Sequence, residues 1–275
     1  MALSLGQGQR AVAQRPEAES SNSAASTTAV ASRPGAGICP ADLERAIAAT
    51  IHSSNFATAQ WGISIESVDQ TTPLYRHNPD ALLIPASNIK LLTTAAALQV
   101  VGDRTPQQQA SFEGALTGIN RDSNNRMADD LLRRIGGQHI VRHTLSALGI
   151  NPTSFEIVDG SGLSRNNRAR PSTFVTLLKS MYTHSESSLF RRSLPVAGVS
   201  GTLRNRFRNT TAQGNVQAKT GTLRGVRALS GYLENDSYGT LAFSIVVNQP
   251  GQSGPVLLRA IDQIVLYTHQ VESCG

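Results

Sequence analysis

The 275-residue chain offers little that would bind a metal ion or nucleic acid. Its six histidines are dispersed, no H-E-x-x-H pattern occurs, and the two cysteines stand far apart, so no cluster has the ligands of a zinc site. Aromatic residues make up only 5% of the chain, and no helix-turn-helix or zinc-finger pattern accompanies its arginines. The net charge of +6 favours anionic surroundings in general. We therefore expect no metal, no cofactor and no nucleic-acid partner.

Long apolar runs are also missing. No segment is apolar for long enough to cross a bilayer. Residues 1–37 contain almost no large apolar side chains and lack the apolar centre of a secretory signal. We expect a disordered leader there, because such a composition cannot offset its own ordering entropy, and no signal peptide in the chain as it stands. The foldable part is predicted to be residues 38–275.

The two cysteines lie at the two ends of this foldable part. Because the termini of a domain often lie close together, a disulfide between Cys39 and Cys274 is one interpretation. Two unpaired surface thiols are the other, and the sequence does not separate the two. A bridge would indicate an oxidising compartment.

Hydrophobic periodicity predicts an α+β fold. Sequential strand-like runs favour antiparallel pairing, and helices from both ends of the foldable part are expected to cover one face of a five-stranded antiparallel sheet. A helical lobe at about 86–182 is expected to be inserted in the sheet lobe, with residues 105–118 as a polar connector. The expected helices are 41–54, 87–102, 125–135, 140–150, 171–182 and 255–270, and the expected sheet strands are 61–68, 74–76, 216–223, 226–234 and 240–248.

Ser87 and Lys90 form an S-x-x-K motif at the start of an apolar helical run. Residues three apart lie on the same face of a helix, so the Lys90 amine can take the proton of the Ser87 hydroxyl without any histidine. The first turn of a helix also carries free N–H groups and a positive dipole end. The motif predicts a serine nucleophile with a lysine base, and an ordinary helix cap beside an exposed lysine is the alternative.

A second motif, Lys219-Thr220-Gly221-Thr222, lies in a strand-like run. Lys219 can supply a second cation, and Gly221 permits close backbone approach. An S-x-x-K motif followed by K-T-G is the outline of a serine acyltransferase that attacks amides. We expect the site at the seam between the helical lobe and the sheet.

A third motif must protonate the leaving amine and hold the substrate amide. Two S-x-N patterns occur, Ser123 with Asn125 and Ser164 with Asn166. We assign this role to the first pattern, because Ser123 is expected at the start of a helix that faces the serine helix across the cleft.

Five collinear segments then resemble one family: IPASNIKLLTTAAAL, INRDSNNRMADDLLRRIG, DGSGLSRNNRARP, LPVAGVSGTLRNRF and AKTGTLRGVRALSGYL. Across residues 42–270 the chain resembles the D-alanyl-D-alanine carboxypeptidase/endopeptidases, the class C low-molecular-mass penicillin-binding proteins. The resemblance implies a DD-peptidase/β-lactamase-like transpeptidase fold. One departure is clear: only about thirty residues separate Lys90 from Ser123, where typical members carry inserted domains. The chain looks like a short form that lacks them.

The resemblance also implies roles for the motifs. Ser87 would be the acylated nucleophile, Lys90 its base, and Ser123 with Asn125 the S-x-N element. Burial and the neighbouring Lys219 are expected to lower the pKa of Lys90. Residues 159–162 would form a buttress near the cleft. The implied substrate-binding residues are Lys219, Thr220, Gly221 and Thr222.

The function implied is a penicillin-sensitive serine D-Ala-D-Ala carboxypeptidase or endopeptidase. Its partners would be peptidoglycan stem peptides and β-lactams, in the periplasm or another extracytoplasmic compartment. A non-catalytic peptidoglycan-binding protein of the same fold, and a serine β-lactamase or esterase, are the other interpretations. The sequence does not separate carboxypeptidase from endopeptidase action, and it leaves the oligomeric state open.

Overall fold

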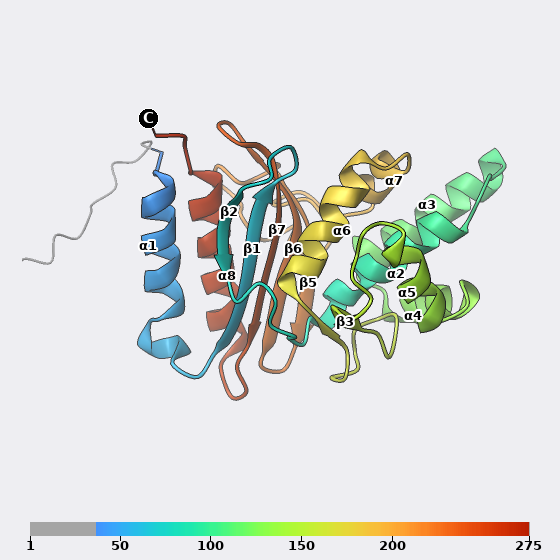
Figure 1. Ribbon diagram of the computed structural model, residues 1–275, viewed down its shortest axis with the longest axis horizontal. Helices are drawn as coiled ribbons and strands as arrows, with labels where there is room; N and C mark the ends of the chain where they lie inside the picture. Colours follow the sequence, from blue (N-terminus) through green and yellow to red (C-terminus); the bar gives the residue numbers. More distant parts are fainter. Residues whose placement is uncertain (1–36, 275) are drawn as a thin grey trace, which may run out of the picture. The chain divides into compact units, whose positions relative to one another are not determined.

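The computed structural model describes residues 37–274 (Figure 1). The leader predicted for residues 1–37 lies outside this range, except for Gly37. The helices are α1 (Pro40–Ile51), α2 (Ile89–Val100), α3 (Pro106–Asn120), α4 (Asn125–Arg134), α5 (Gln138–Ser146), α6 (Pro171–Thr183), α7 (Ser187–Arg192) and α8 (Gly254–His269), with 3₁₀ turns η1 (Ser54–Phe56), η2 (Ala86–Asn88) and η3 (Gly201–Leu203). The strands are β1 (Gln60–Ser67), β2 (Pro73–His77), β3 (Phe155–Glu156), β4 (Arg168–Ala169), β5 (Val216–Leu223), β6 (Val226–Asn235) and β7 (Gly239–Asn248).

Five antiparallel strands form the main sheet in the order β2-β1-β7-β6-β5. Strands β5, β6 and β7 follow one another along the chain, with Gly231 of β6 opposite Ala218 of β5 and Phe243 of β7. Strand β1 pairs with β7 and places Ile63 opposite Ile245. The predicted α+β class with a five-stranded antiparallel sheet is confirmed.

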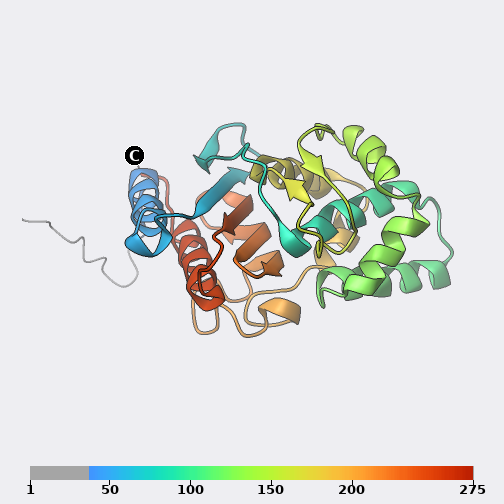
Figure 2. The same ribbon diagram turned by 90° about the horizontal axis from the view of Figure 1, so that it is seen from below.

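The two faces of the sheet meet different helices, because side chains alternate along a strand. Ile63, Ile65, Phe243 and Ile245 are buried in one core with the terminal helices α1 and α8. Helix α6 contacts β7, β1 and β6. Figure 1 shows α1 and α8 on one side of the sheet and α6 on the other, and Figure 2 shows the same layers from below. The covering of one face by both terminal helices agrees with the prediction.

Helix α2 is the centre of a second hydrophobic core. It is apolar on nearly all sides, which is the pattern of a helix surrounded by other elements. Residues 89–98 of this helix are all buried, and α3, α4, α5 and α6 pack around it. Lys90 lies within this apolar helix and is 0% exposed. A charged side chain in such a place requires polar partners.

Two sequence expectations are wrong. Residues 105–118, expected to be a polar connector, lie largely in the 15-residue helix α3. The cause is local: Thr105 and Gln108 form a reciprocal capping box, and Pro106 occupies the first helical position. Ser87 does not open the serine helix itself but lies in the 3₁₀ turn η2, directly before α2. Helix α7 was not expected either.

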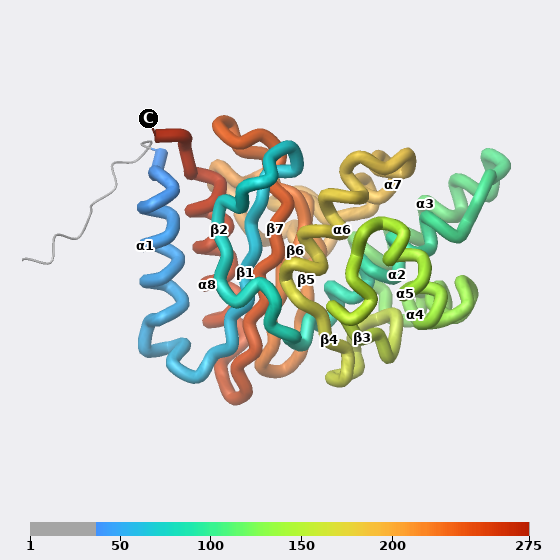
Figure 3. The backbone as a smooth tube through the Cα atoms, in the orientation of Figure 1, coloured from blue at the N-terminus to red at the C-terminus, as the bar shows by residue number. Residues whose placement is uncertain are grey.

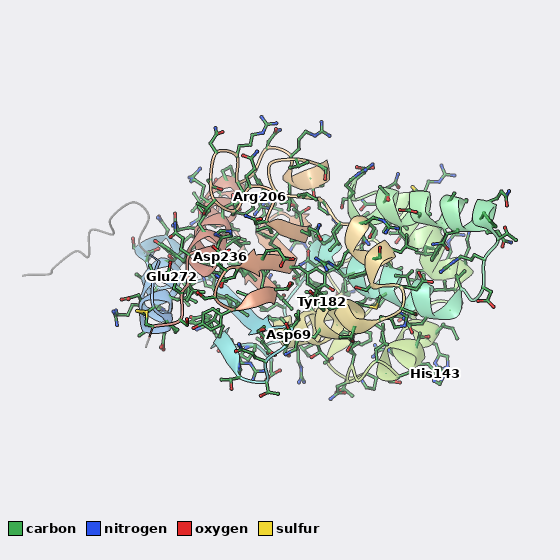
Figure 4. All side chains as sticks on the ribbon, turned by 90° about the horizontal axis from the view of Figure 1, so that it is seen from above. Asp69, His143, Tyr182, Arg206, Asp236 and Glu272 are labelled. Carbon is green, nitrogen blue, oxygen red and sulfur yellow. A yellow bond between two sulfur atoms is a disulfide. The ribbon has the colours of Figure 1, made fainter. Side chains whose placement is uncertain are left out.

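The two ends of the described region are joined. Cys39 and Cys274 form a disulfide, and Ile38 pairs with Val271 next to it. Figure 3 shows the start of α1 beside the C-terminal end of the chain, and Figure 4 shows the sulfur atoms near the labelled Glu272. Of the two interpretations that the sequence left open, the disulfide is therefore the correct one. None of the described helices has both the length and the apolarity required to span a bilayer.

Candidate active site

Ser87 lies at the junction of the sheet and the helical core. The turn η2 that carries it contacts β5 and β6 and leads directly into α2. Ala86, just before the serine, has a φ of 49°, in the left-handed region that non-glycine residues rarely adopt. Ser123, on the opposite wall, has a φ of 58°. Such conformations persist only where the surrounding structure holds them, and here they flank one group of polar side chains.

Lys90 makes three hydrogen bonds with its ammonium group. Its Nζ donates to Ser87 Oγ at 2.9 Å, to Asn125 Oδ1 at 2.8 Å, and to the carbonyl oxygen of Ser161. Ser87 Oγ also lies 3.2 Å from that carbonyl oxygen. All three N–H donors of Lys90 are thus used within the site, so the side chain is held in one position against the serine hydroxyl.

Burial lowers the pKa of Lys90 from its usual value to about 8. The negative charges of Asp129 and Asp159 oppose this effect and keep the pKa from falling further. The sequence had suggested that Lys219 would also depress the pKa of Lys90. Repulsion between two ammonium groups acts on both of them, and burial together with the charge of Lys90 holds the pKa of Lys219 well below the usual range.

The loop of residues 159–162 presents a backbone carbonyl oxygen, that of Ser161, to Lys90. The Asp159 carboxylate accepts hydrogen bonds from the N–H groups of Gly162 and Ser164, each at 2.6 Å, and so closes the loop on itself. Asp129, on α4, accepts the Ser161 N–H at 2.8 Å. These two carboxylates orient the Ser161 carbonyl oxygen toward Lys90. The loop therefore lies against the site as a support, in agreement with the sequence interpretation, while the contribution of Asp129 was not foreseen.

Lys219 connects the sheet with the S-x-N loop. Its side chain is 0% exposed, and its Nζ donates to Ser123 Oγ at 2.8 Å and to the Thr220 carbonyl oxygen at 3.0 Å. Asn125, two residues after Ser123, is bonded to Lys90. Four sequence motifs thus meet at one place, although they are far apart along the chain.

Polar groups also lie beneath the serine turn. Asn88 Nδ2 donates to Ser230 Oγ at 2.6 Å, and Ser230 Oγ bonds Ser244 Oγ at 2.8 Å. All three side chains are buried. This short chain of hydrogen bonds ties the serine turn to β6 and β7, and no local sequence pattern predicts it.

The turn packs so closely on β5 that only glycine fits at position 221. A Cβ atom at Gly221 would lie 2.5 Å from the backbone oxygen of Pro85, two residues before the serine. We expect Gly221→Ala to push the turn away and to reduce acylation of Ser87 by about 10²-fold, since displacements of about 1 Å have such effects. Gly114→Ala, where nothing lies within 4 Å, is the matched control and should act like the unchanged protein. Equal acylation rates for both variants would contradict this packing argument.

Thr220 is half-buried and Thr222 is exposed, both on the edge strand β5. The second S-x-N pattern does not join the site: the Ser164 hydroxyl accepts the backbone N–H of Asn166, and Asn166 is exposed. Thr202, which sequence reasoning missed, bonds Thr220 through its hydroxyl. No motif marks it, because its partner lies on another element.

The family model of the D-Ala-D-Ala carboxypeptidase 3 (S13) family matches residues 43–109 and 105–271. The chain belongs to this family. The two matched stretches meet at 105–109, between Lys90 and Ser123, where the inserted domains of the family were expected to be missing. Within the described residues this interval holds only the rest of α2, a short connection and α3. The short-form interpretation agrees with this arrangement.

Curated relatives of this S13 chain carry matching names. A D-alanyl-D-alanine carboxypeptidase of Actinomadura sp. (strain R39) is 40% identical over 184 residues, which is 61% of this chain and 33% of the relative. A penicillin-sensitive carboxypeptidase A of Dictyostelium discoideum is 37% identical over 167 residues, which is 52% of this chain and 31% of the relative. The chain thus spans about a third of the length of these relatives.

Solved structures share the fold. Penicillin-binding protein 4 of Haemophilus influenzae, in complex with a β-lactam, superposes with a TM-score of 0.69 at 15% identity and covers 86% of this chain and 100% of its own. A TLA-3 extended-spectrum β-lactamase gives 0.68 at 16% identity, with 84% of this chain and 98% of its own covered. At such identities the likeness establishes the transpeptidase-like fold and nothing about activity.

Proposed function

We propose that this S13 chain is a serine D-Ala-D-Ala carboxypeptidase that acts through an acyl-enzyme on Ser87. One observation carries the proposal: a buried lysine with a pKa of about 8 lies 2.9 Å from a serine hydroxyl. A lysine of ordinary pKa would hold its proton near neutral pH and would not serve as a base. Membership of the S13 family supports the same reaction class.

In the first step, neutral Lys90 accepts the proton of Ser87 as its oxygen attacks the penultimate carbonyl of the peptide. The N–H groups of Ser87 and Thr222 stabilise the oxyanion, each contributing about 3–4 kcal/mol in sites of this kind. The register of β5 supports this role. The N–H of Ala218 points away from β6, and Thr222 lies an even number of residues further along the strand, so its N–H points away from β6 as well. The peptide would then lie along this edge as an added strand.

The remaining residues handle the leaving group and the acyl chain. Lys219, Thr220 and Thr222 would hold the terminal carboxylate, and a carboxylate there would favour the protonated form of Lys219. Ser123 would pass a proton to the departing D-alanine. Asn125 already accepts from Lys90 through Oδ1, which leaves its Nδ2 to bind the acyl amide. Water then releases the acyl-enzyme.

The disulfide supports an extracytoplasmic location, because such bridges persist in oxidising compartments. We place the enzyme in the periplasm or an equivalent space, with peptidoglycan stem peptides as substrates. Residues 38–275 would form its catalytic domain. β-Lactams would acylate Ser87 and leave slowly.

Mass spectrometry after incubation with benzylpenicillin tests the proposal. We expect one adduct on the peptide that contains Ser87 and none in Ser87→Ala. Ser164→Ala, in the S-x-N pattern outside the site, is the matched control and should be labelled like the unchanged protein. An adduct on another residue, or no adduct, would refute the assignment. Turnover of a D-Ala-D-Ala peptide would exclude a purely binding role.

A further inference from the structure

The turn η3 touches both walls of the site. The backbone N–H of Thr202 donates to the Arg121 carbonyl oxygen at 3.2 Å, two residues before Ser123. A Cβ atom at Gly201, whose φ is 55°, would lie 2.4 Å from that same oxygen, so only glycine permits the close approach. From the other side, Thr202 Oγ1 lies 2.8 Å from Thr220 Oγ1 on β5. The turn thus bridges the S-x-N loop and the lysine strand.

The segment that leads into this turn covers part of the free edge of β5. The N–H of Ala218 donates to the Pro195 carbonyl oxygen at 3.1 Å, and the N–H of Ala197 donates to the Val216 carbonyl oxygen at 2.9 Å. Residues 195–197 therefore occupy the edge of the strand as far as Ala218. A peptide added to β5 can pair only from Thr220 onward, and the turn with Thr202 lies where its pairing would end.

The two threonine hydroxyls leave one proton free for a ligand. Each hydroxyl has one hydrogen, and their mutual hydrogen bond uses only one of the two. Thr220 Oγ1 is the donor in that bond, so the hydrogen of the Thr202 hydroxyl is the one left to donate to an acceptor. Thr202 is exposed, and the buried amine of Lys219 lies beside Thr220, bonded to its carbonyl oxygen. A free donor near a buried amine suits an anionic acceptor.

We propose that Thr202 is part of the subsite for the terminal carboxylate of the peptide, and that its turn closes the groove there. The site would select chains that end in a free carboxylate over chains that are amidated at that position. This inference rests on the proposed function and makes it more specific, because it assigns the preference for a free chain end to one residue outside the known motifs of the sequence.

The test compares an acetylated Lys-D-Ala-D-Ala peptide with its C-terminal carboxamide. The unchanged protein should prefer the acid. In Thr202→Val we expect the KM for the acid to rise about 10-fold or more, which is the effect of one hydrogen bond to a charged group, while kcat changes little. The preference for the acid over the amide should fall by the same factor. Thr202→Ser, which keeps the hydroxyl, should retain the preference. Thr211→Val, at an exposed threonine of the loop between η3 and β5, should change nothing.

Two results would overturn the inference. One is an unchanged acid-to-amide ratio in Thr202→Val, and the other is an equal fall of kcat for both peptides, which would indicate a purely structural turn. A separate result, the absence of a benzylpenicillin adduct on Ser87, would show that the proposed function itself is wrong. In that case calorimetric binding of the acid and the amide to both proteins still measures the carboxylate preference.

Discussion

Replacing Lys90 by methionine should slow the acylation of Ser87 by benzylpenicillin about 10²–10⁴-fold, the usual contribution of a general base. Methionine is nearly isosteric with the lysine stem and fits the apolar surroundings of α2, so the fold should persist. The loss would then come from the missing amine. Lys179→Met is the matched control, because Lys179 lies on α6, pairs with Glu66 of β1 and is hydrogen-bonded to no residue of the site. A Lys90→Met variant that is acylated at the normal rate would exclude the lysine as the base.

The same lysine should set the pH dependence of the acylation of Ser87. Only the neutral amine accepts a proton, and with a pKa of about 8 its neutral fraction falls tenfold for each pH unit below that value. Acylation should therefore rise with pH up to about 8 and then level off. Stopped-flow acylation rates between about pH 6 and pH 9 measure this. A profile that is flat across this range, or one that falls toward high pH, would contradict the assignment.

Of the substitutions proposed, removal of the disulfide should lower the free energy of unfolding most. Cys39 and Cys274 are 235 residues apart, and the loop-entropy relation gives about 5 kcal/mol for a loop of that size. Measured losses commonly amount to about 2–5 kcal/mol, which for a domain of this length corresponds to a fall in Tm of roughly 10 °C. The double variant Cys39→Ser/Cys274→Ser should show this fall in calorimetry.

Two further measurements make this second prediction specific. Reduction of the unchanged protein should lower its Tm by a similar amount, while the double variant should not respond to reductant. Acylation of Ser87 at 25 °C should be preserved in the variant, because the bridge joins α1 to the C-terminal end, on the opposite side of the sheet from α2 (Figure 3). Equal melting temperatures would mean that the packing of α1 on α8 holds the ends together by itself.

The sequence predicted the parts of the site that depend on local spacing. Ser87 and Lys90 are three residues apart, and this separation alone brings the amine to the hydroxyl. The strands of the main sheet were equally predictable, since β1 alternates apolar and polar residues and β7 is an almost continuous apolar run. Helix α3 was missed because its sequence is polar, although Thr105, Pro106 and Gln108 form a complete start signal.

Other parts of the site depend on contacts between distant segments. Asp129 supports the Ser161 backbone, and Thr202 bonds Thr220, only because the chain folds back on itself. No residue pattern within any of these segments specifies the two contacts.

Four stretches of chain supply the groups around Ser87, and the lysine acquires its lowered basicity only when all of them enclose it. A partly folded or misassembled molecule would retain the serine yet lack its reactivity. A fluorescent penicillin should therefore act as a reporter of conformational integrity: the labelled fraction of a preparation would count the molecules that have completed their tertiary structure.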